Sequence, residues 1–243
     1  MLKGIHTSAS GMIPQARKQE VIANNVANAT TPGFKADRLF TKELTNAVAK
    51  QQPTRSPWET PMLDKTYVDF APGTFDQTGN PLDLAIDGDG FFQLQDAEGN
   101  RFLSRSGHFT VDAEGFIAHP DGLRLIGEGG PIAAGDGQVA VDPDGTVQVD
   151  GLTVARIVPV QVPDLMQLEK VGSSLFAVSE GQELASSTNS EIRQGYLETA
   201  NVDIVQEMVE MIVTYREYEA NAKSMTTQDQ TLDHLFRRVA GDE

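Results

Sequence analysis

The sequence predicts an α+β fold in which antiparallel N- and C-terminal helices, forming a coiled-coil-like core, flank a β-rich central domain. Two observations predict it. Apolar residues recur at helical spacing near both ends of the 243-residue chain, and short apolar runs separated by glycine and aspartate fill its middle. We expect residues 1–33 and 200–243 to pair as one discontinuous helical domain. Residues 34–69 are expected to form an extended connector, and residues 70–199 the β-rich domain.

The N-terminal helix is predicted from a seam with alternating spacings of four and three residues. Small side chains occupy much of this seam, which runs through Ile5, Ala9, Met12, Ala16, Gln19, Ala23 and Val26. Pro14 lies inside it, and a proline removes a backbone donor and clashes with the preceding turn. We therefore expect a helix from Ile5 to Val26 whose first turns are kinked or shortened.

A stronger apolar stripe predicts a C-terminal helix from about Asn201 to Arg238. The stripe comprises Val205, Met208, Ile212, Tyr215, Ala222, Met225, Leu232, Leu235 and Val239. Asn201 is the expected N-cap, and Asp203 and Glu207 place negative charge near the positive end of the helix dipole. Because a helix cannot bury its own stripe, this side must lie against another element.

Two kinds of partner for these stripes are open. In the first, the two terminal helices cover each other and form a packing layer within a monomer. In the second, the stripes form a seam between subunits, where burial of each large side chain would contribute about 1.5–3 kcal/mol. The candidate interface residues for such a seam are Ile5, Ala9, Met12, Ala16, Ala23, Val205, Met208, Ile212 and Tyr215.

The central stretch from about Asp69 to Gly195 is predicted to be a meander of antiparallel strands. Its apolar runs are 84–86, 91–94, 116–118, 139–141, 147–149 and 154–158. Three turns begin with Asp and end with Gly, as type I turns prefer, at 96–99, 112–115 and 142–145. The preceding connector has prolines at intervals of four residues and admits a short helix near Leu39 to Ala49.

Composition excludes several classes of partner. The chain has 35 acidic and 19 basic residues, a formal charge of −16, so its surface repels nucleic acid and anionic lipid. It has no cysteine, which removes disulfides, thiol nucleophiles and thiolate metal sites. The N-terminus lacks the apolar run of a signal peptide, and no stretch reaches the roughly 18 apolar residues of a membrane helix.

No motif for catalysis, cofactor binding or metal binding stands out. The acidic turn Asp87–Gly90 departs from the EF-hand template, because phenylalanines follow where an oxygen ligand and a glycine are needed. The four histidines are far apart in sequence and lack the i, i+4 pairing of a helical zinc site. We therefore expect no enzyme activity, no cofactor and no metal.

Several segments carry more than a hydrophobic pattern. The N-terminal one, 21–35, joins a helix, an asparagine-rich end and a Thr-Pro-Gly-Phe turn, with Asn24, Asn25, Asn28, Pro32, Gly33 and Phe34 as its motif residues. The C-terminal ones are 195–203, 208–212 and 215–221, and the central ones are 80–92 and 105–109. Together these segments resemble the flagellar basal-body rod protein family of the FlgF/FlgG type. We expect the asparagines to satisfy backbone groups where the helix ends, Gly33 to permit a turn, and Phe34 to anchor it.

The resemblance implies a structural subunit of the basal-body rod that polymerises with itself and other rod proteins through its terminal helices. It also implies export by the flagellar type III apparatus without a cleaved signal peptide, and no direct membrane insertion. The short connector and the segments 126–132 and 228–232 favour the proximal-rod subtype. A distal-rod subunit is the alternative within the family. A soluble β-rich binding module with a helical stalk is the alternative from another class.

Overall fold

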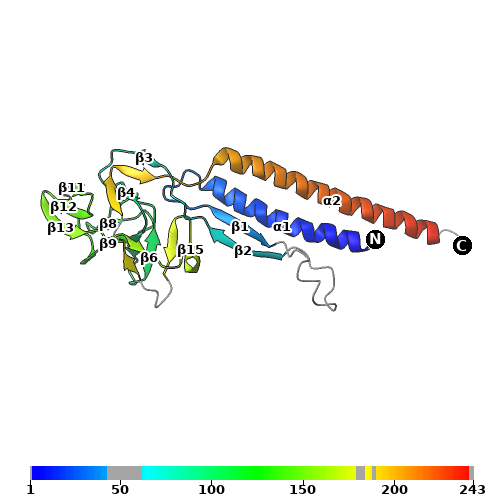
Figure 1. Cartoon of the computed structure of the whole chain (residues 1–243), viewed down its shortest axis with the longest axis horizontal. Helices are drawn as coiled ribbons and strands as arrows, with labels where there is room; N and C mark the ends of the chain where they lie inside the picture. The colour runs from blue at the N-terminus through cyan, green and yellow to red at the C-terminus, as the bar shows by residue number, and fades with distance from the viewer. Residues whose placement is uncertain (1, 43–61, 179–183, 188–189, 241–243) are drawn as a thin grey trace. The chain divides into compact units, whose positions relative to one another are not determined.

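The chain divides into two compact units in its computed structural model (Figure 1). The structure describes residues 2–42, 62–178, 184–187 and 190–240. One unit, here called the helical unit, comprises residues 1–27, 37–69 and 203–243. The other, the β unit, comprises residues 28–36 and 70–202. The chain therefore crosses between the units four times. Two helices flank the β-rich region in sequence, so helices and strands are segregated as in the α+β class.

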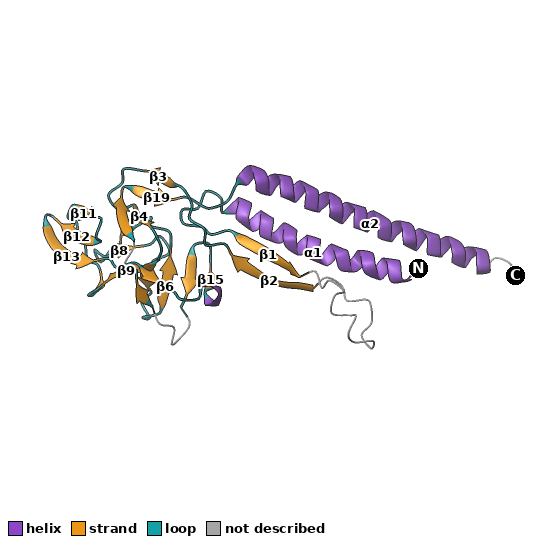
Figure 2. Ribbon diagram, in the orientation of Figure 1, coloured by secondary structure: helices purple, strands orange, loops and turns teal. Residues whose placement is uncertain are grey.

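The helical unit contains two long helices and a strand pair (Figure 2). Its elements are α1 (Leu2–Ala27), β1 (Asp37–Lys42), β2 (Met62–Val68) and α2 (Ile204–Ala240). The helices lie side by side, and β1 and β2 pair antiparallel. The helix α1 continues through Pro14, so the expected shortening of its first turns is not observed.

Two expectations about element boundaries are wrong. Asp203, not Asn201, caps α2, because its carboxylate accepts from the backbone N–H groups of Val205 at 2.9 Å and Gln206 at 3.1 Å. The expected short helix near Leu39 is replaced by β1, which satisfies its backbone groups by pairing with β2. The remainder of that expected helix lies outside the described residues.

The β unit consists of short strands and one 3-10 turn. In chain order these are β3 (Phe75–Gln77), β4 (Leu84–Asp87), β5 (Phe92–Gln95), β6 (Arg101–Ser104), β7 (Thr110–Val111), β8 (Ile117–Ala118), β9 (Arg124–Gly127), β10 (Gly130–Pro131), β11 (Val139–Val141), β12 (Thr146–Val149), β13 (Leu152–Arg156), β14 (Val160–Gln161), η1 (Leu165–Gln167), β15 (Glu169–Val171), β16 (Leu175–Ala177), β17 (Ala185–Ser186), β18 (Glu191–Gln194) and β19 (Tyr196–Glu198).

These strands pair antiparallel throughout the described part of the chain, but they do not form a simple meander. The largest sheet has the order β15-β16-β6-β5-β9-β8-β7, with β10 beside β9. Strands from the end of the unit return to pair with its beginning, β18 with β4 and β19 with β3. The unit therefore closes only when residues 191–198 reach strands more than a hundred residues earlier in the chain.

The three Asp-to-Gly turns form as expected. Each joins two neighbouring antiparallel strands, and each glycine N–H donates to its aspartate carbonyl over 2.9–3.3 Å. Behind them, a core of buried aliphatic side chains fills the unit, with Phe92 and Phe109 meeting edge to face at a centroid distance of 5.3 Å. Within the described residues, no helix is long and apolar enough to span a membrane.

Candidate functional site

Residues of α2 that were assigned to an assembly interface are exposed. In the isolated chain the exposed fractions are 71% for Val205, 52% for Met208, 56% for Ile212 and 50% for Tyr215. We call these four residues the apolar stripe. Figure 1 shows α1 alongside α2, yet α1 leaves this stripe uncovered. The two helices therefore lie side by side without burying Val205, Met208, Ile212 and Tyr215 between them.

The candidate interface residues of α1 behave differently from one another. Ala9, Met12 and Ala16 are half-buried, whereas Ala23 is exposed. The side chain of Ile5 lies outside the described residues. Ile22, which the seam did not include, is 3% exposed and is the best buried apolar side chain of α1 among those described. The seam on α1 is therefore partly covered within the chain.

The side of α2 that contacts α1 carries polar residues. Lys18 Nζ lies 2.7 Å from Glu210 Oε1, and Asn221 Nδ2 donates to Gln15 Oε1 over 3.0 Å. Glu207 is 3% exposed and accepts from Arg38 of β1 at 3.0 Å. Ion pairs and amide hydrogen bonds thus join the elements of the helical unit beside half-buried apolar side chains such as Met211 and Tyr218.

Asn25 links α1 to β1 through a two-way hydrogen bond. It is 1% exposed, its Nδ2 donates to the Asp37 carbonyl, and its Oδ1 accepts from the Asp37 N–H, both over 2.9 Å. An amide side chain is the only kind that matches a backbone donor and acceptor in this way. Asn25 therefore satisfies strand backbone, and α1 ends two residues later at Ala27.

In the β unit, residues 28–36 form a tight turn that packs into the core. Thr31 N–H donates to the Asn28 carbonyl at 3.0 Å, and Pro32 follows. Gly33 has φ of +67°, and its N–H donates to the Glu198 carbonyl over 2.7 Å. A Cβ on Gly33 would lie 2.2 Å from the Ser106 nitrogen, so only glycine fits.

Phe34 follows the turn into the core of the β unit. It is fully buried, and the Lys170 ammonium lies 4.0 Å from its ring centroid, a cation–π contact. Asn201 binds the same segment twice: its N–H donates to the Phe34 carbonyl over 3.4 Å, and its Oδ1 accepts from Ala36 N–H over 2.8 Å. These bonds use the side chain that had been expected to cap α2.

A buried charge cluster joins the two ends of the β unit. Lys35 and Glu198 are each 1% exposed, and Lys35 Nζ lies 2.6 Å from Glu198 Oε1. Arg105, 7% exposed, lies 3.4 Å from Glu198 Oε2. Burial lowers the pKa of the Arg105 guanidinium, while Glu198 and Asp89 oppose that change. The cluster therefore ties segments of the chain that are 163 residues apart.

Backbone groups complete this charge cluster. Lys35 Nζ donates to the Ala71 carbonyl over 2.8 Å, and Gly73 N–H donates to Glu198 Oε1 over 3.0 Å. Arg105 donates to two further backbone carbonyls. Removing one member would leave buried charges uncompensated, which typically costs about 3–5 kcal/mol. The Gly33 turn and the charge cluster together link residues 28–36 to Glu198, near the other end of the β unit.

Sequence reasoning missed the charge cluster. Lys35, Arg105 and Glu198 each stand in one of the segments that carry the family resemblance. The available signal for burial was a charged residue with small or apolar neighbours, as at Lys35 and Arg105. Nothing in the spacing of the three residues shows that they meet, since the contacts depend on the return of β19 to β3.

Ser106, His119 and Asp121 are arranged in the order of a serine hydrolase triad, but the serine is shielded from solvent. His119 lies 3.3 Å from Ser106 Oγ through Nε2 and 3.1 Å from Asp121 Oδ2 through Nδ1. Ser106 is only 3% exposed, and its backbone nitrogen is closely covered by the Gly33 turn. A nucleophile must reach its substrate, so this hydroxyl has a structural role.

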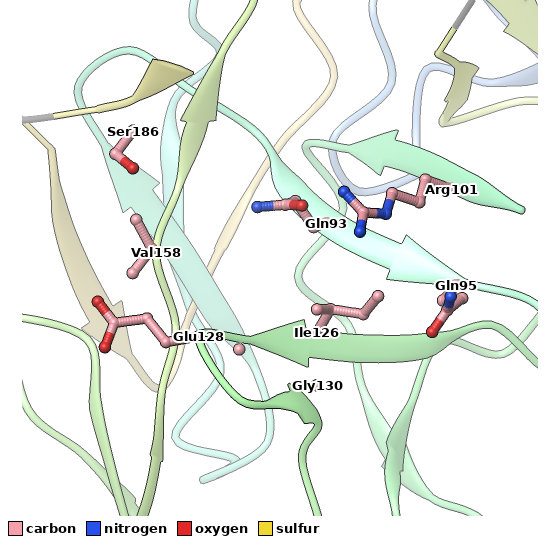
Figure 3. A pocket seen from close by; sticks show the side chains of 9 residues that line it. Gln93, Gln95, Arg101, Ile126, Glu128, Gly130, Val158 and Ser186 are labelled. Atoms are coloured by element: carbon pink, nitrogen blue, oxygen red, sulfur yellow. The ribbon is translucent and has the colours of Figure 1, made fainter. Parts of the chain in front are cut away.

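A groove of about 360 Å³ opens on the β unit (Figure 3). Figure 3 shows Glu128, Val158 and Ser186 at one end and Gln95 and Arg101 at the other. Among the described residues that line the groove there is no histidine and no pair of titratable groups in hydrogen-bond contact. Among the described residues, no group of three or more histidine, aspartate or glutamate side chains is placed to hold a metal ion.

Comparisons with known proteins agree along the chain. Three family models match: "Flagella basal body rod protein" over residues 5–35, "Flagellar hook protein FlgE/F/G D1 domain" over 85–170, and "Flagellar basal body rod FlgEFG protein C-terminal" over 193–237. The first and last of these regions contain the Gly33 turn and Glu198, respectively. Each of the three matched regions thus contains one charged member of the cluster, Lys35, Arg105 or Glu198.

Curated relatives match over nearly their whole length. The rod protein FlgF of Caulobacter vibrioides is 32% identical, covering 93% of each chain. The rod protein FlgG of Bacillus subtilis is 31% identical, covering 97% of this chain and 98% of its own. FlgF of Escherichia coli is 30% identical, covering 93% of each chain. These are structural proteins and not enzymes, and the chain belongs to the family of flagellar basal-body rod proteins.

Proposed function

We propose that this chain is a structural subunit of the bacterial flagellar basal-body rod and that it polymerises through its terminal helices into the helical drive shaft. The observation that carries the proposal is the apolar stripe of α2, four large side chains at least half exposed in the isolated chain. An exposed apolar stripe of this kind marks a protein interaction surface. Membership of the rod protein family supports another rod subunit as the partner.

Burial of the stripe supplies a driving force for assembly. Full burial of one large apolar side chain contributes about 1.5–3 kcal/mol, so covering the exposed half of four gives roughly 3–6 kcal/mol per subunit. The contact is heterologous, with the stripe of one subunit facing a different surface of the next. Such a contact that does not close into a ring grows along a helical axis.

Within each subunit, the two helices form an antiparallel, coiled-coil-like pair. Two contacts support this direction, because Lys18 pairs with Glu210, whereas Gln15, earlier in α1, pairs with Asn221, later in α2. The remaining candidate interface residues, Ile5, Ala9, Met12, Ala16 and Ala23, belong to the α1 side of the same core. Subunits add to the growing end with this pair as the inner layer.

The proximal-rod subtype is the favoured assignment. The relatives include both FlgF and FlgG proteins at nearly equal identity, so the sequence features of the chain carry the choice. These features are the short connector after Phe34 and the segments 126–132 and 228–232. The distal-rod subtype is the alternative, and the extent of the rod formed without this subunit separates the two.

The rod assignment also implies how the subunit is exported and what it binds. The subunit is exported through the flagellar type III apparatus without a cleaved signal peptide, and it then joins other rod proteins in the basal body. Its net charge of −16 disfavours contact with nucleic acid or anionic lipid on the way.

Electron microscopy of basal bodies from the source bacterium tests this function. Deletion of the gene is expected to leave truncated rods without filaments, and restoration of the gene is expected to repair them. A truncation close to the membrane supports the proximal subtype, whereas a longer rod stub supports the distal one. Intact flagella in the deletion strain would refute the rod assignment.

A further inference from the structure

Residues 28–36 enter the β unit as a separate segment of the chain. They follow α1, and β1 of the helical unit comes directly after them. The β unit resumes only at Phe70, so residues 37–69 are the segment's covalent link to the rest of that unit. The place of the segment in the β unit therefore depends on non-covalent contacts, as for a bound peptide on a tether.

Two side chains of the segment are enclosed by the β unit. Phe34 is fully buried, and the Lys170 ammonium lies 4.0 Å from its ring centroid. Lys35 is 1% exposed, and its Nζ lies 2.6 Å from Glu198 Oε1 and 2.8 Å from the Ala71 carbonyl oxygen. The surrounding groups thus match an aromatic ring followed by a cation.

The β unit also contacts the backbone of the segment. Gly33 N–H donates to the Glu198 carbonyl over 2.7 Å, and Ala36 N–H donates to Asn201 Oδ1 over 2.8 Å. Gly33 has φ of +67°, and a Cβ there would lie 2.2 Å from the Ser106 nitrogen. These contacts therefore select a glycine directly before the aromatic residue and the cation.

The walls of this site are joined to one another by bonds that do not involve the segment. Glu198 Oε1 accepts from Gly73 N–H over 3.0 Å, and Glu198 Oε2 lies 3.4 Å from Arg105. Arg105 also donates to two backbone carbonyls, and Asn201 Nδ2 donates to the Ala71 carbonyl over 3.0 Å. Release of the segment would return its own cation to water and leave Glu198 paired with Arg105. The site therefore keeps its shape and its carboxylate when it is empty.

We propose that the β unit contains a preformed peptide-binding site for a Pro-Gly-Phe-Lys segment, which residues 28–36 fill in the structure. The ligand is a peptide with a glycine turn, a buried aromatic ring and a cation, in that order. Covalent attachment holds the chain's own segment near the site at an effective concentration of about a millimolar, so it excludes a free peptide. A chain whose own segment has lost its contacts leaves the site open to the same peptide in trans. The site belongs to the β unit alone and does not depend on the proposed assembly.

Fluorescence anisotropy of a labelled peptide tests the site on full-length chains. The probe is a synthetic peptide of residues 28–37, and the matched control peptide differs from it only by Gly33→Ala. The emptied chain carries Phe34→Ser with Lys35→Ser. The control chain carries Thr30→Ser, at an exposed position of the same segment. Circular dichroism and denaturant unfolding show whether each chain keeps a folded β unit.

The probe is expected to bind the emptied chain and to leave the unmodified and Thr30→Ser chains unbound. The Gly33→Ala peptide is expected to bind the emptied chain at least about 30-fold more weakly, the equivalent of about 2 kcal/mol. An emptied chain with an unfolded β unit would overturn the inference, because the segment would then be part of the fold and not a ligand. Absence of binding to a folded emptied chain at about 1 mM probe would overturn it too. Equal binding of the two peptides, or equal binding of the probe to emptied and unmodified chains, would place the peptide elsewhere and has the same consequence.

Discussion

Replacement of Ile212 by aspartate is expected to abolish polymerisation while leaving the isolated subunit folded. Ile212 is 56% exposed, so assembly covers roughly half of a side chain whose full burial contributes about 1.5–3 kcal/mol. The variant loses roughly 1 kcal/mol of that contribution. It also places an unpartnered polar group in a dry interface, which costs about 2 kcal/mol or more.

The combined loss, roughly 3–4 kcal/mol, corresponds to a subunit contact weaker by about 150-fold to 1,000-fold. In the isolated chain the change is expected to stay within about 0.5 kcal/mol, because the substituted side chain lies at the surface. Sedimentation of purified subunits, together with motility of cells that carry the variant, measures the two effects. Gln230→Asp is the matched control, since it adds the same charge to an exposed position on α2 outside the stripe.

The reasoning is refuted if Ile212→Asp subunits build rods of normal length. It is also refuted if the variant unfolds in isolation, because the loss of assembly would then have a different cause. Circular dichroism of the unassembled variant separates these outcomes from the expected one.

Three further predictions concern the β unit. Gly33→Ala should lower its stability by more than about 2 kcal/mol in denaturant unfolding, since positive φ and the close Ser106 backbone both oppose a Cβ. Glu198→Gln should cost about 3–5 kcal/mol in the same assay, because the buried charges of Lys35 and Arg105 both lose the carboxylate that they contact. Stability should also fall on acidification below about pH 6.5, because burial lowers the pKa of His119 and the unfolded chain then binds the extra proton.

Each of these predictions has a control in the same chain. Gly129→Ala adds a Cβ that meets nothing within 4 Å and should leave stability nearly unchanged. Glu20→Gln breaks an exposed ion pair with Arg17 and should cost less than about 1 kcal/mol. His119→Asn should flatten the decline in stability as pH falls through the unfolded-state pKa. An equal decline in that variant would show that other groups cause it.

The sequence predicted the classes of element well, because its signals are local. Helical spacing indicated both helices, and the Asp-to-Gly turns indicated the hairpins that Gly99, Gly115 and Gly145 complete with positive φ. Strand order was not predictable in the same way. The pairing of β18 with β4 and of β19 with β3 joins segments far apart in the chain, and no local pattern encodes which early strand a late one meets.

The apolar pattern of α2 was predicted, but its division between two faces was not. The predicted stripe begins with Val205 on the exposed side and reaches Met225 and Leu232 on the shielded side. A pattern spaced at three and four residues drifts around a helix of 3.6 residues per turn, so it does not stay on one face. The covered part also carries tertiary contacts such as the hydrogen bond between Asn221 and Gln15, which hydrophobic spacing does not report.

Photo-crosslinking from Tyr215 in assembled basal bodies tests most directly that the apolar stripe is a contact between rod subunits. Tyr215 is replaced by p-benzoylphenylalanine, which keeps an aromatic ring at a half-exposed position, and Gln230 carries the same group as control. The account predicts adducts with rod subunits from position 215 in basal bodies, and none from the isolated chain. Assembled basal bodies in which position 215 forms no adduct with any rod subunit would contradict it.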